Sequence, residues 1–193
     1  MKIGVLSLQG DFIKHRKMLE SLSVDVVLVK YDHDLKDING LILPGGESTT
    51  IGKLLIKFKL MDLIKEKIKS GMPVFGTCAG MILLARNINN ADQPGLRLLD
   101  IEVERNGYGS QIESFEADLL LKIPEKKKIR GVFIRAPLIK NTGKNVKILS
   151  TFNEAPVVVL ENNILAANFH PELTENNSLH KYFLSICRDA SMS

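Results

Sequence analysis

Short apolar runs alternate with longer amphipathic stretches through the first half of the chain. Four runs have the aliphatic and β-branched composition of buried strands: Ile3–Leu8, Val24–Val29, Leu41–Leu43 and Pro73–Thr77. Three stretches have the apolar spacing of helices: Phe12–Leu22, Thr50–Ser70 with a break expected near Lys59, and Ala79–Asn87. This alternation predicts a parallel sheet that is covered by helices on both faces.

The second half of the chain has a different pattern, because its strand-like runs follow one another without long helices. The predicted strands are Leu98–Glu104, Ala117–Ile123, Gly131–Ile134, Val146–Phe152, Val157–Glu161 and Ile164–Asn168. Turns are expected at Asn141–Asn145 and at Asn162-Asn163, since asparagine tolerates the left-handed conformation of a tight hairpin. A last helix is predicted from Leu179 to Arg188. We therefore expect hairpins that extend or flank the sheet.

The length and composition fit one globular domain spanning residues 1–193. The chain is 45% apolar and 25% charged, with a net charge of +4. Its densest basic cluster, Lys126–Lys128, is typical of a solvated turn. No apolar stretch approaches the roughly 20 residues that cross a bilayer. We therefore expect neither a nucleic-acid nor a membrane partner.

The chain has two cysteines, Cys78 and Cys187, and their spacing is not that of a metal site. A disulfide framework is not indicated, and free cysteines are typical of a reducing compartment. The apolar run at the N-terminus is too short for a signal peptide and is typical of a strand. We therefore expect a cytoplasmic protein without a bound metal.

Cys78 lies where a predicted strand turns into a predicted helix, within the segment Gly76-Thr77-Cys78-Ala79-Gly80. A nucleophile on such an elbow needs small neighbours, because the turn crowds the backbone. The N-terminus of the following helix favours the thiolate, which is the attacking species. A buried cysteine is more often inert, but the flanking glycines and the strand–helix junction favour a nucleophile.

A cysteine nucleophile needs a base, and that base needs a third group to orient it. His170 directly follows the predicted strand Ile164–Asn168, so it should emerge at the same sheet edge as Cys78. Glu172 stands two residues further on, and a proline fixes the backbone between them. The pattern predicts a catalytic triad of Cys78, His170 and Glu172.

The other histidines have no comparable sequence context. His33 and His180 lie in no such motif, and we expect both on the surface. No role is predicted for His15.

The segment Pro44-Gly45-Gly46-Glu47-Ser48-Thr49-Thr50 lies between the third predicted strand and the next helix. Its two glycines let backbone N–H groups face a ligand at the positive end of that helix. We interpret the segment as half of an oxyanion hole for a tetrahedral intermediate. Ser48 or Thr49 is expected to cap the helix as well. The segment is not a Walker loop, because no Gly-Lys-Ser/Thr follows.

Six ordered segments resemble class I (triad) glutamine amidotransferases, and more narrowly the glutaminase subunit of pyridoxal 5′-phosphate synthase. They are Leu8–Asp11, Pro44–Thr50, Gly76–Gly80, Arg105-Asn106 with Gly109-Ser110-Gln111 and Ser114-Phe115, Phe133–Pro137, and His170–Thr174. The segments cover nearly the whole chain, which makes the resemblance specific. It implies a flavodoxin-like three-layer α/β fold with a central, mostly parallel sheet, helices on both faces and added hairpin strands.

The resemblance also implies the reaction, in which Cys78 forms a γ-glutamyl thioester and glutamine gives glutamate and ammonia. Six residues match positions at which this family holds glutamine: Gly46, Glu47, Ser48, Arg105, Ile134 and Arg135. Arginine and carboxylate groups suit the α-carboxylate and α-ammonium of glutamine. The backbone N–H groups of Gly46 and Ala79 form the implied oxyanion hole.

A synthase partner follows from the same resemblance. That partner makes pyridoxal phosphate from a pentose phosphate, a triose phosphate and the delivered ammonia, while the glutaminase subunit itself holds no cofactor. Ser110 departs from the pattern, because many relatives carry an arginine there, and this puts the contacts near Tyr108–Gln111 in doubt.

Gln9 and Gly10 are candidates for regulation, since they follow the first strand at the sheet edge of Cys78 and Gly46. An amidotransferase that hydrolysed glutamine freely would waste it. We hypothesise that docking of the synthase orders the Gln9–Gly10 or Gly45–Gly46 backbone and completes the oxyanion hole. The alternative is that Gln9 merely closes a strand–helix turn.

Three other functions stay open at this point. A triad amidotransferase of another pathway, such as imidazole glycerol phosphate synthesis or amination of an aromatic acid, is disfavoured by the segments at Phe133–Pro137 and Arg105–Gln111. A cysteine hydrolase or chaperone of related fold would lack the pair Arg105 and Arg135. A silent binding module would lack the intact triad.

Overall fold

The structure is a computed structural model that describes residues 1–89, 91–107 and 114–192. Its main sheet has seven strands in the order β10-β11-β12-β4-β3-β1-β2. Their bounds are β1 (Lys2–Leu6), β2 (Asp25–Val29), β3 (Gly40–Leu43), β4 (Val74–Thr77), β10 (Lys147–Phe152), β11 (Ala155–Glu161) and β12 (Ile164–Ala167). The five neighbours β2-β1-β3-β4-β12 are parallel, whereas β11 and β10 continue the sheet antiparallel. The parallel part has the flavodoxin-like strand order, as expected.

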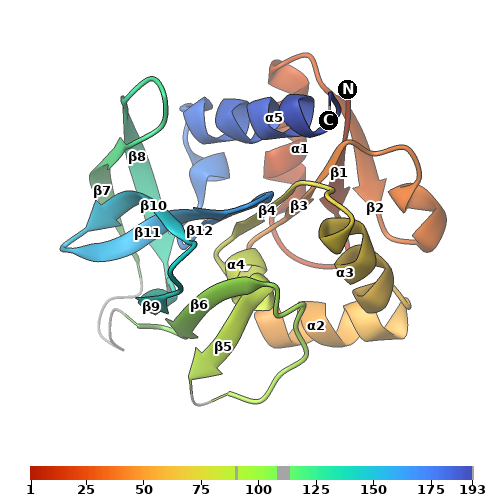
Figure 1. Cartoon of the computed structure of the whole chain (residues 1–193), viewed down its shortest axis with the longest axis horizontal. Helices are drawn as coiled ribbons and strands as arrows, with labels where there is room; N and C mark the ends of the chain where they lie inside the picture. Colours follow the sequence, from red (N-terminus) through yellow and green to blue (C-terminus); the bar gives the residue numbers. More distant parts are fainter. Residues whose placement is uncertain (90, 108–113, 193) are drawn as a thin grey trace.

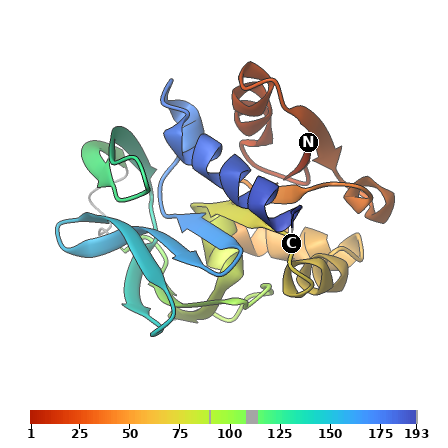
Figure 2. The same cartoon turned by 45° about the horizontal axis from the view of Figure 1, so that its top comes forward.

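Helices cover both faces of this sheet (Figure 1). One face carries α1 (Phe12–Ser21) and α5 (Ser178–Ala190), and the other carries α2 (Ser48–Lys57), α3 (Met61–Lys69) and α4 (Ala79–Leu84). Side chains alternate between two apolar cores: on β12, Leu165 packs on the α1/α5 side and Ala166 on the other. Figure 2 shows α5 lying over the central strands. The predicted three-layer α/β class is confirmed.

Two smaller sheets flank the main one. A three-stranded sheet consists of β5 (Ala85–Asn89), β6 (Leu99–Glu104) and β9 (Leu138–Thr142), and a hairpin consists of β7 (Ser114–Leu121) and β8 (Lys127–Ile134). Two short 3₁₀ helices, η1 (Asp32–Leu35) and η2 (Pro171–Leu173), complete the elements used below. Hairpins that extend and flank the sheet were predicted, and both are present.

Several predicted boundaries were wrong. The helix predicted at Ala79–Asn87 ends at Leu84, because the following residues pair with β6 as strand β5. The turn predicted at Asn141–Asn145 begins later, since Asn141 and Thr142 pair with β6 as the end of β9, a strand that the sequence did not predict. Long-range strand pairing overrides the local preference in both cases, for a helix in the first and for a turn in the second.

Two other local predictions agree with the structure, and a third agrees in part. The helix predicted at Thr50–Ser70 breaks near Lys59, whose φ is +57°, and becomes α2 and α3. Asn162 adopts the expected left-handed conformation between β11 and β12, with a φ of +52°. The basic cluster Lys126–Lys128 is exposed, but Lys127 and Lys128 begin strand β8 rather than forming a turn.

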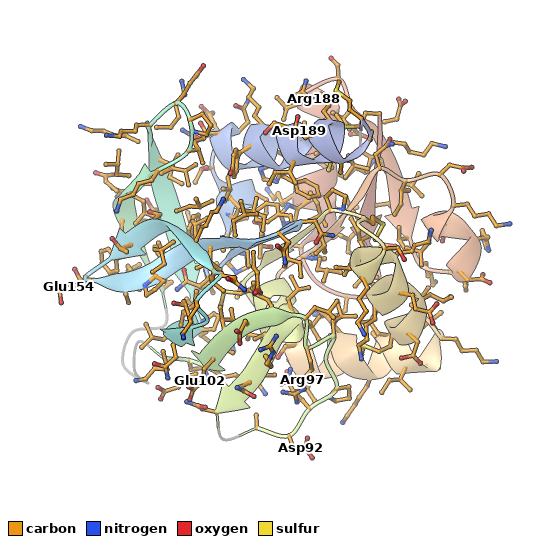
Figure 3. The ribbon with its side chains drawn as sticks, viewed as in Figure 1. Asp92, Arg97, Glu102, Glu154, Arg188 and Asp189 are labelled. Carbon is orange, nitrogen blue, oxygen red and sulfur yellow. The ribbon has the colours of Figure 1, made fainter. Side chains whose placement is uncertain are left out.

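Charged side chains project from the outer loops and hairpins of the fold. Figure 3 shows Glu154 at the tip of the β10–β11 hairpin and Asp92 in the loop that follows β5, both pointing away from the body. The two ends of the chain come together, where Met1 and Met192 line the same surface hollow (Figure 1). Within the described ranges no helix is long and apolar enough to cross a membrane.

The topology brings four turns to one edge of the sheet. The carboxyl ends of β1, β3, β4 and β12, which are neighbours in the sheet, lead into the segments that begin near Gln9, Gly45, Cys78 and His170. Ligands bind at this edge in open α/β sheets. The segments that the sequence singled out therefore converge because of the strand order.

Candidate active site

Cys78 stands on a sharp turn between β4 and α4. Its φ of +46° and ψ of −103° are unfavourable for a residue with a side chain. Gly80 lies so close to β3 that a Cβ there would collide with the carbonyl oxygen of Leu43. The predicted elbow with its small flanking residue is therefore present, and the Cys78 side chain lines an open pocket.

His170 and Glu172 form a close pair in the turn after β12. His170 Nδ1 lies 2.7 Å from Glu172 Oε1, and both side chains are buried. The backbone N–H of His170 donates to the carbonyl of Val132 on β8, which ties the turn to the neighbouring hairpin. Cys78 and His170 line the same pocket, and Cys78 is one of the two residues that raise the pKa of His170. The three predicted triad residues therefore lie next to one another.

The neighbours of His170 and Glu172 stabilise the charged forms of both side chains. Burial by itself lowers the pKa of His170, but hydrogen bonds and charges from Cys78 and Glu172 outweigh it and raise the pKa to about 10. Burial raises the pKa of Glu172, but interactions with His15 and His170 hold it below its usual range. The arrangement therefore favours an imidazolium at His170 beside the carboxylate of Glu172.

The structure corrects one prediction about the histidines. His180 was expected on the surface, but it is fully buried on α5 and its Nε2 lies 3.0 Å from Nδ1 of the buried His15 on α1. Burial lowers the pKa of His180 to about 3. Such burial needed the helix α5 to fold back over β4, which no local pattern indicates. His33 is exposed on η1, as predicted.

A pocket of about 330 Å³ opens in front of Cys78, within the size range of small-molecule sites. All six predicted glutamine-binding residues line it, together with Cys78, His170 and Gln9. The sequence did not assign a role to three further lining residues, Asp11, Ile82 and Asn106. Arg135 has a φ of +42°, so its backbone turns sharply at the pocket wall.

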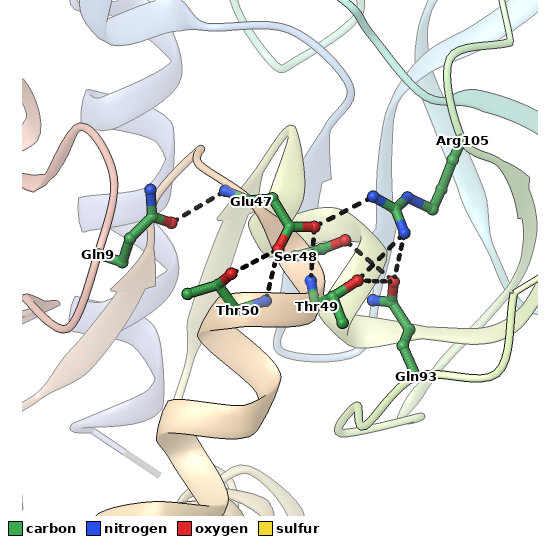
Figure 4. A network of polar contacts seen from close by, with 7 residues as sticks. All are labelled: Gln9, Glu47, Ser48, Thr49, Thr50, Gln93 and Arg105. Atoms are coloured by element: carbon green, nitrogen blue, oxygen red, sulfur yellow. Dashed lines mark hydrogen bonds and ion pairs between the residues drawn. The ribbon is translucent and has the colours of Figure 1, made fainter.

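Glu47 is the centre of a polar network at one end of the pocket (Figure 4). Its carboxylate accepts hydrogen bonds from the backbone N–H groups of Thr49 and Thr50, so Glu47 caps α2 in place of the predicted Ser48 or Thr49. Burial raises the pKa of Glu47, but these bonds and that of the Thr50 hydroxyl outweigh it and lower the pKa to about 2. Arg105 Nη2 lies 3.1 Å from Glu47 Oε1. A fixed cation and a fixed anion thus face the same pocket.

Gln93 supports this network and was missed by the sequence analysis. Its buried Oε1 accepts hydrogen bonds from Arg105, Ser48 and Thr49, at 3.1, 3.1 and 3.2 Å (Figure 4). It comes from the loop between β5 and β6, where neither apolar periodicity nor a motif marks it. Gln93 therefore fixes the direction of the Arg105 guanidinium.

The Gln9–Gly10 turn lies directly on the Gly45–Gly46 turn. Gln9 Oε1 accepts a hydrogen bond from the backbone N–H of Glu47 at 2.9 Å, and Asp11 N–H donates to the carbonyl of Gly45 at 3.1 Å. A Cβ at Gly10, whose φ is +102°, would collide with that carbonyl oxygen. The side chain of Gln9 therefore braces the segment that was predicted to form half of the oxyanion hole.

Other predicted residues lie apart from the pocket or outside the described part of the chain. Tyr108–Gln111, including Ser110, falls outside the described residues. Cys187 is buried on α5, and burial raises its pKa to about 12, which makes it unreactive. Both cysteines are free, as predicted.

One group of side chains near the pocket has the spacing of a metal site. Single ligand atoms of Asp11, His170 and Glu172 lie within 4.8 Å of one another. Two of these residues already bond each other through Nδ1 and Oε1. A metal ion there would compete with the triad.

The arrangement can carry out acyl transfer on an amino-acid amide. It combines a thiol on an elbow, an imidazole held by a carboxylate, and a pocket with one cation and one anion. Those are the parts of nucleophilic catalysis.

Comparisons with known proteins agree with this chemistry. Residues 5–189 match the SNO glutamine amidotransferase family. A protein from Desulforamulus reducens named pyridoxal 5′-phosphate synthase subunit PdxT is 52% identical over 188 residues, covering 97% of this chain and 100% of that relative. Its namesake from Thermotoga maritima is 50% identical over the same length, with the same two coverages.

Solved structures match as well. A crystal structure described as glutamine amidotransferase superposes with a TM-score of 0.92 at 43% identity, covering 96% of this chain and 98% of that one. The structure of PurLQS from Thermotoga maritima gives a TM-score of 0.65 at 17% identity, over 98% of this chain and 95% of that one. The second match shows only that the two proteins share a fold.

Proposed function

Because the chain belongs to the SNO glutamine amidotransferase family, we propose that it is the glutaminase subunit of a pyridoxal 5′-phosphate synthase. Two relatives that are 52% and 50% identical over nearly the whole chain bear that subunit name. The observation that carries the proposal is the chain of Cys78, His170 and Glu172 at the wall of a pocket that also holds Arg105 and Glu47. Residues 1–193 act in this proposal as one glutaminase domain.

Recognition of glutamine uses the two charges at the far end of the pocket. Arg105 binds the α-carboxylate and Glu47 binds the α-ammonium, so the side-chain amide extends toward Cys78. These two residues also pair with each other, with Arg105 Nη2 3.1 Å from Glu47 Oε1, which holds both charges at the same end of the pocket. The remaining binding residues form the walls of the pocket: Gly46, Ser48, Ile134 and Arg135.

Hydrolysis begins when the Cys78 thiolate attacks the carbonyl carbon of the amide. The carbonyl electrons move to oxygen, and the tetrahedral intermediate collapses as the His170 imidazolium gives a proton to the leaving ammonia. The product is a γ-glutamyl thioester on Cys78. His170 then takes a proton from water as the hydroxide attacks the thioester carbon. The C–S bond breaks, which returns the Cys78 thiolate beside the protonated His170, and glutamate leaves after its new carboxyl group gives its proton to water. Glu172 orients the imidazole throughout.

The negative oxygen of each intermediate needs backbone donors. The N–H of Ala79 begins α4 and has no partner inside its helix, so it points toward the site of attack. The N–H of Gly46, in the segment braced by Gln9, supplies the second donor. These two groups form the proposed oxyanion hole.

Ammonia released in the pocket is passed to a synthase partner, which uses it to build pyridoxal phosphate. Free ammonia would be protonated in water, so direct transfer keeps it nucleophilic. The two free cysteines fit a reducing compartment, and the proposed location is the cytoplasm.

The test compares two nitrogen sources in the complex of this chain with its synthase partner. Cys78→Ala is expected to abolish pyridoxal phosphate synthesis from glutamine while leaving synthesis from ammonium salts intact, because only the thioester step needs the thiolate. Cys187→Ala is the matched control and should keep both activities, since Cys187 lies outside the pocket. Glutamine turnover by Cys78→Ala within about tenfold of wild type would contradict the assignment.

A further inference from the structure

Two buried histidines lie behind the triad, and the mechanism above does not use them. His15 on α1 and His180 on α5 are both fully buried, and their nearest ring nitrogens are 3.0 Å apart. Phe75 of β4 packs edge-on against both rings. Burial of a polar ring costs free energy unless its nitrogens find partners, so this pair requires a physical reason.

The pair reaches the catalytic carboxylate from the side opposite His170. Nε2 of His15 lies 3.3 Å from Oε2 of Glu172, whereas Oε1 of Glu172 is bonded to His170. Oε2 is buried and makes no hydrogen bond in the described part of the chain, so the nearby Nε2 of His15 acts on it electrostatically. Each oxygen of Glu172 therefore faces one imidazole.

His15 also touches the elbow that carries the nucleophile. The same Nε2 lies 3.1 Å from the hydroxyl oxygen of Thr77, the residue before Cys78. One N–H on His15 thus lies between the carboxylate of the triad and the last residue of β4. Its position links the two halves of the catalytic machinery, which come from distant parts of the chain.

The surroundings assign the protons on both rings. Burial lowers the pKa of His15 and that of His180, so each ring is neutral and carries one N–H. A proton on Nε2 of His15 faces the Glu172 oxygen, whereas the other tautomer would set a lone pair against that carboxylate. Nδ1 of His15 then accepts the N–H from Nε2 of His180. His180 therefore fixes the tautomer of His15.

We propose that His15 is a positioning residue for the catalytic carboxylate, and that His180 holds it in the competent tautomer. The triad is then the outer part of a buried chain that runs Cys78–His170–Glu172–His15–His180. This inference rests on the proposed function only for the identity of the reaction. A buried carboxylate with one hydrogen-bonded oxygen could rotate about its last bond, whereas the N–H dipole of His15, 3.3 Å from the second oxygen, favours the orientation that faces His170.

The first test compares variants on the same helix in the complex with the synthase partner. His15→Leu removes the donor, and glutamine kcat/KM is expected to fall about tenfold to a hundredfold with little change in KM. His15→Gln keeps one donor and one acceptor and should restore most of the loss. Leu19→Ala, one turn further along α1 and fully buried, is the control for lost stability without a lost donor.

The pH profile separates positioning from a merely structural role. The groups that face His15 and Glu172 are His170, Asp11 at the N-cap of α1, Thr77 on β4 and His180 on α5. Without the His15 donor the charged form of Glu172 loses support, so it takes up a proton at higher pH. The acid limb of kcat/KM should therefore move to higher pH in His15→Leu, but not in His15→Gln or Leu19→Ala.

A second variant and a second readout keep the inference testable if His15→Leu fails to fold. His180→Phe keeps an aromatic ring beside Phe75 but removes the donor to His15, and it should lower kcat several-fold with the same shift of the acid limb. The pH dependence of Cys78 alkylation by iodoacetamide, followed by mass spectrometry, reports on the same series of side chains and needs no glutamine.

These readouts distinguish two failures. If wild type does not hydrolyse glutamine but the alkylation profile shifts in His15→Leu, the proposed function fails and the inference stands. If wild type hydrolyses glutamine while His15→Leu, or His180→Phe in its place, matches Leu19→Ala in both pH profiles, the inference is overturned.

Discussion

The imidazole ring of His170 lies directly against the backbone of Gly45. A Cβ at Gly45 would collide with Cε1 of the ring and stand 2.9 Å from Nδ1. Gly45 therefore provides the space that the ring of His170, the proposed base, occupies. The two glycines of this turn differ in their surroundings, because Gly46 faces the pocket and Gly45 faces the ring of His170.

Replacing Gly45 with alanine should move the ring of His170 away from Cys78. A displacement of about 1 Å can cost roughly a hundredfold in rate, so kcat should fall by about that factor while the chain stays folded. Glutamine turnover and thermal unfolding of the same samples would check this. Gly71→Ala is the control, since its φ of +103° strains the backbone but its Cβ meets no atom within 4 Å. A normal kcat in Gly45→Ala would mean that the ring does not need this space.

Arg105 and Arg135 both line the pocket, but only Arg105 is held by Glu47, Thr49 and Gln93. Arg105→Ala should raise KM for glutamine about tenfold to a hundredfold with a much smaller change in kcat, because a charge-assisted bond contributes about 1.5–3 kcal/mol. Arg135→Ala should also raise KM, but less. Arg86→Ala is the control, because Arg86 pairs with Asp100 outside the pocket. Steady-state kinetics would check this, and an unchanged KM in both pocket variants would show that neither arginine binds glutamine.

Gln9 offers a test of activation by the partner. The isolated subunit is expected to be nearly inactive. Docking of the synthase is expected to order the Gln9–Gly10 or Gly45–Gly46 backbone and so complete the oxyanion hole. Loss of one oxyanion donor costs about 10²–10³ in kcat, which sets the size of the activation. Because Gln9 Oε1 accepts the Glu47 N–H, Gln9→Ala should lower turnover in the presence of partner. Glutaminase assays with and without saturating synthase decide it, and full activity of the isolated wild type would end the idea.

Buried His180 should make the protein sensitive to acid. Burial lowers its folded-state pKa to about 3, whereas the unfolded chain binds a proton near 6.5. The free energy of unfolding should therefore fall as the pH drops from about 6.5 toward 3. Above that window His180 is neutral in both states and adds no pH dependence. In His180→Phe the slope in this window should be smaller by about 1.4 kcal/mol per pH unit. Urea unfolding at several pH values would measure it, and equal slopes would show that His180 is protonated in the folded state.

The sequence by itself determined the parallel core and the place of the proposed nucleophile, Cys78. Aliphatic runs that end in glycine or cysteine predicted β1, β3 and β4, and parallel strands bring their carboxyl ends to one edge. Cys78, His170 and Glu172 could be named because a turn and a strand end are local features. The same local reasoning failed at β5 and β9, whose residues are strands only because β6 lies beside them.

The tertiary structure alone decided which polar groups meet. His15 and His180 are 165 residues apart, and they touch because α1 and α5 cover the same face of the sheet. Glu47 caps α2 and pairs with Arg105 because β6 brings that arginine across the pocket, and Gln93 joins them from an irregular loop. A local pattern reports which face of an element is apolar, but the partner of a buried polar atom depends on how distant elements pack. For this reason the proposed triad could be named from the sequence, whereas the groups that surround it could not.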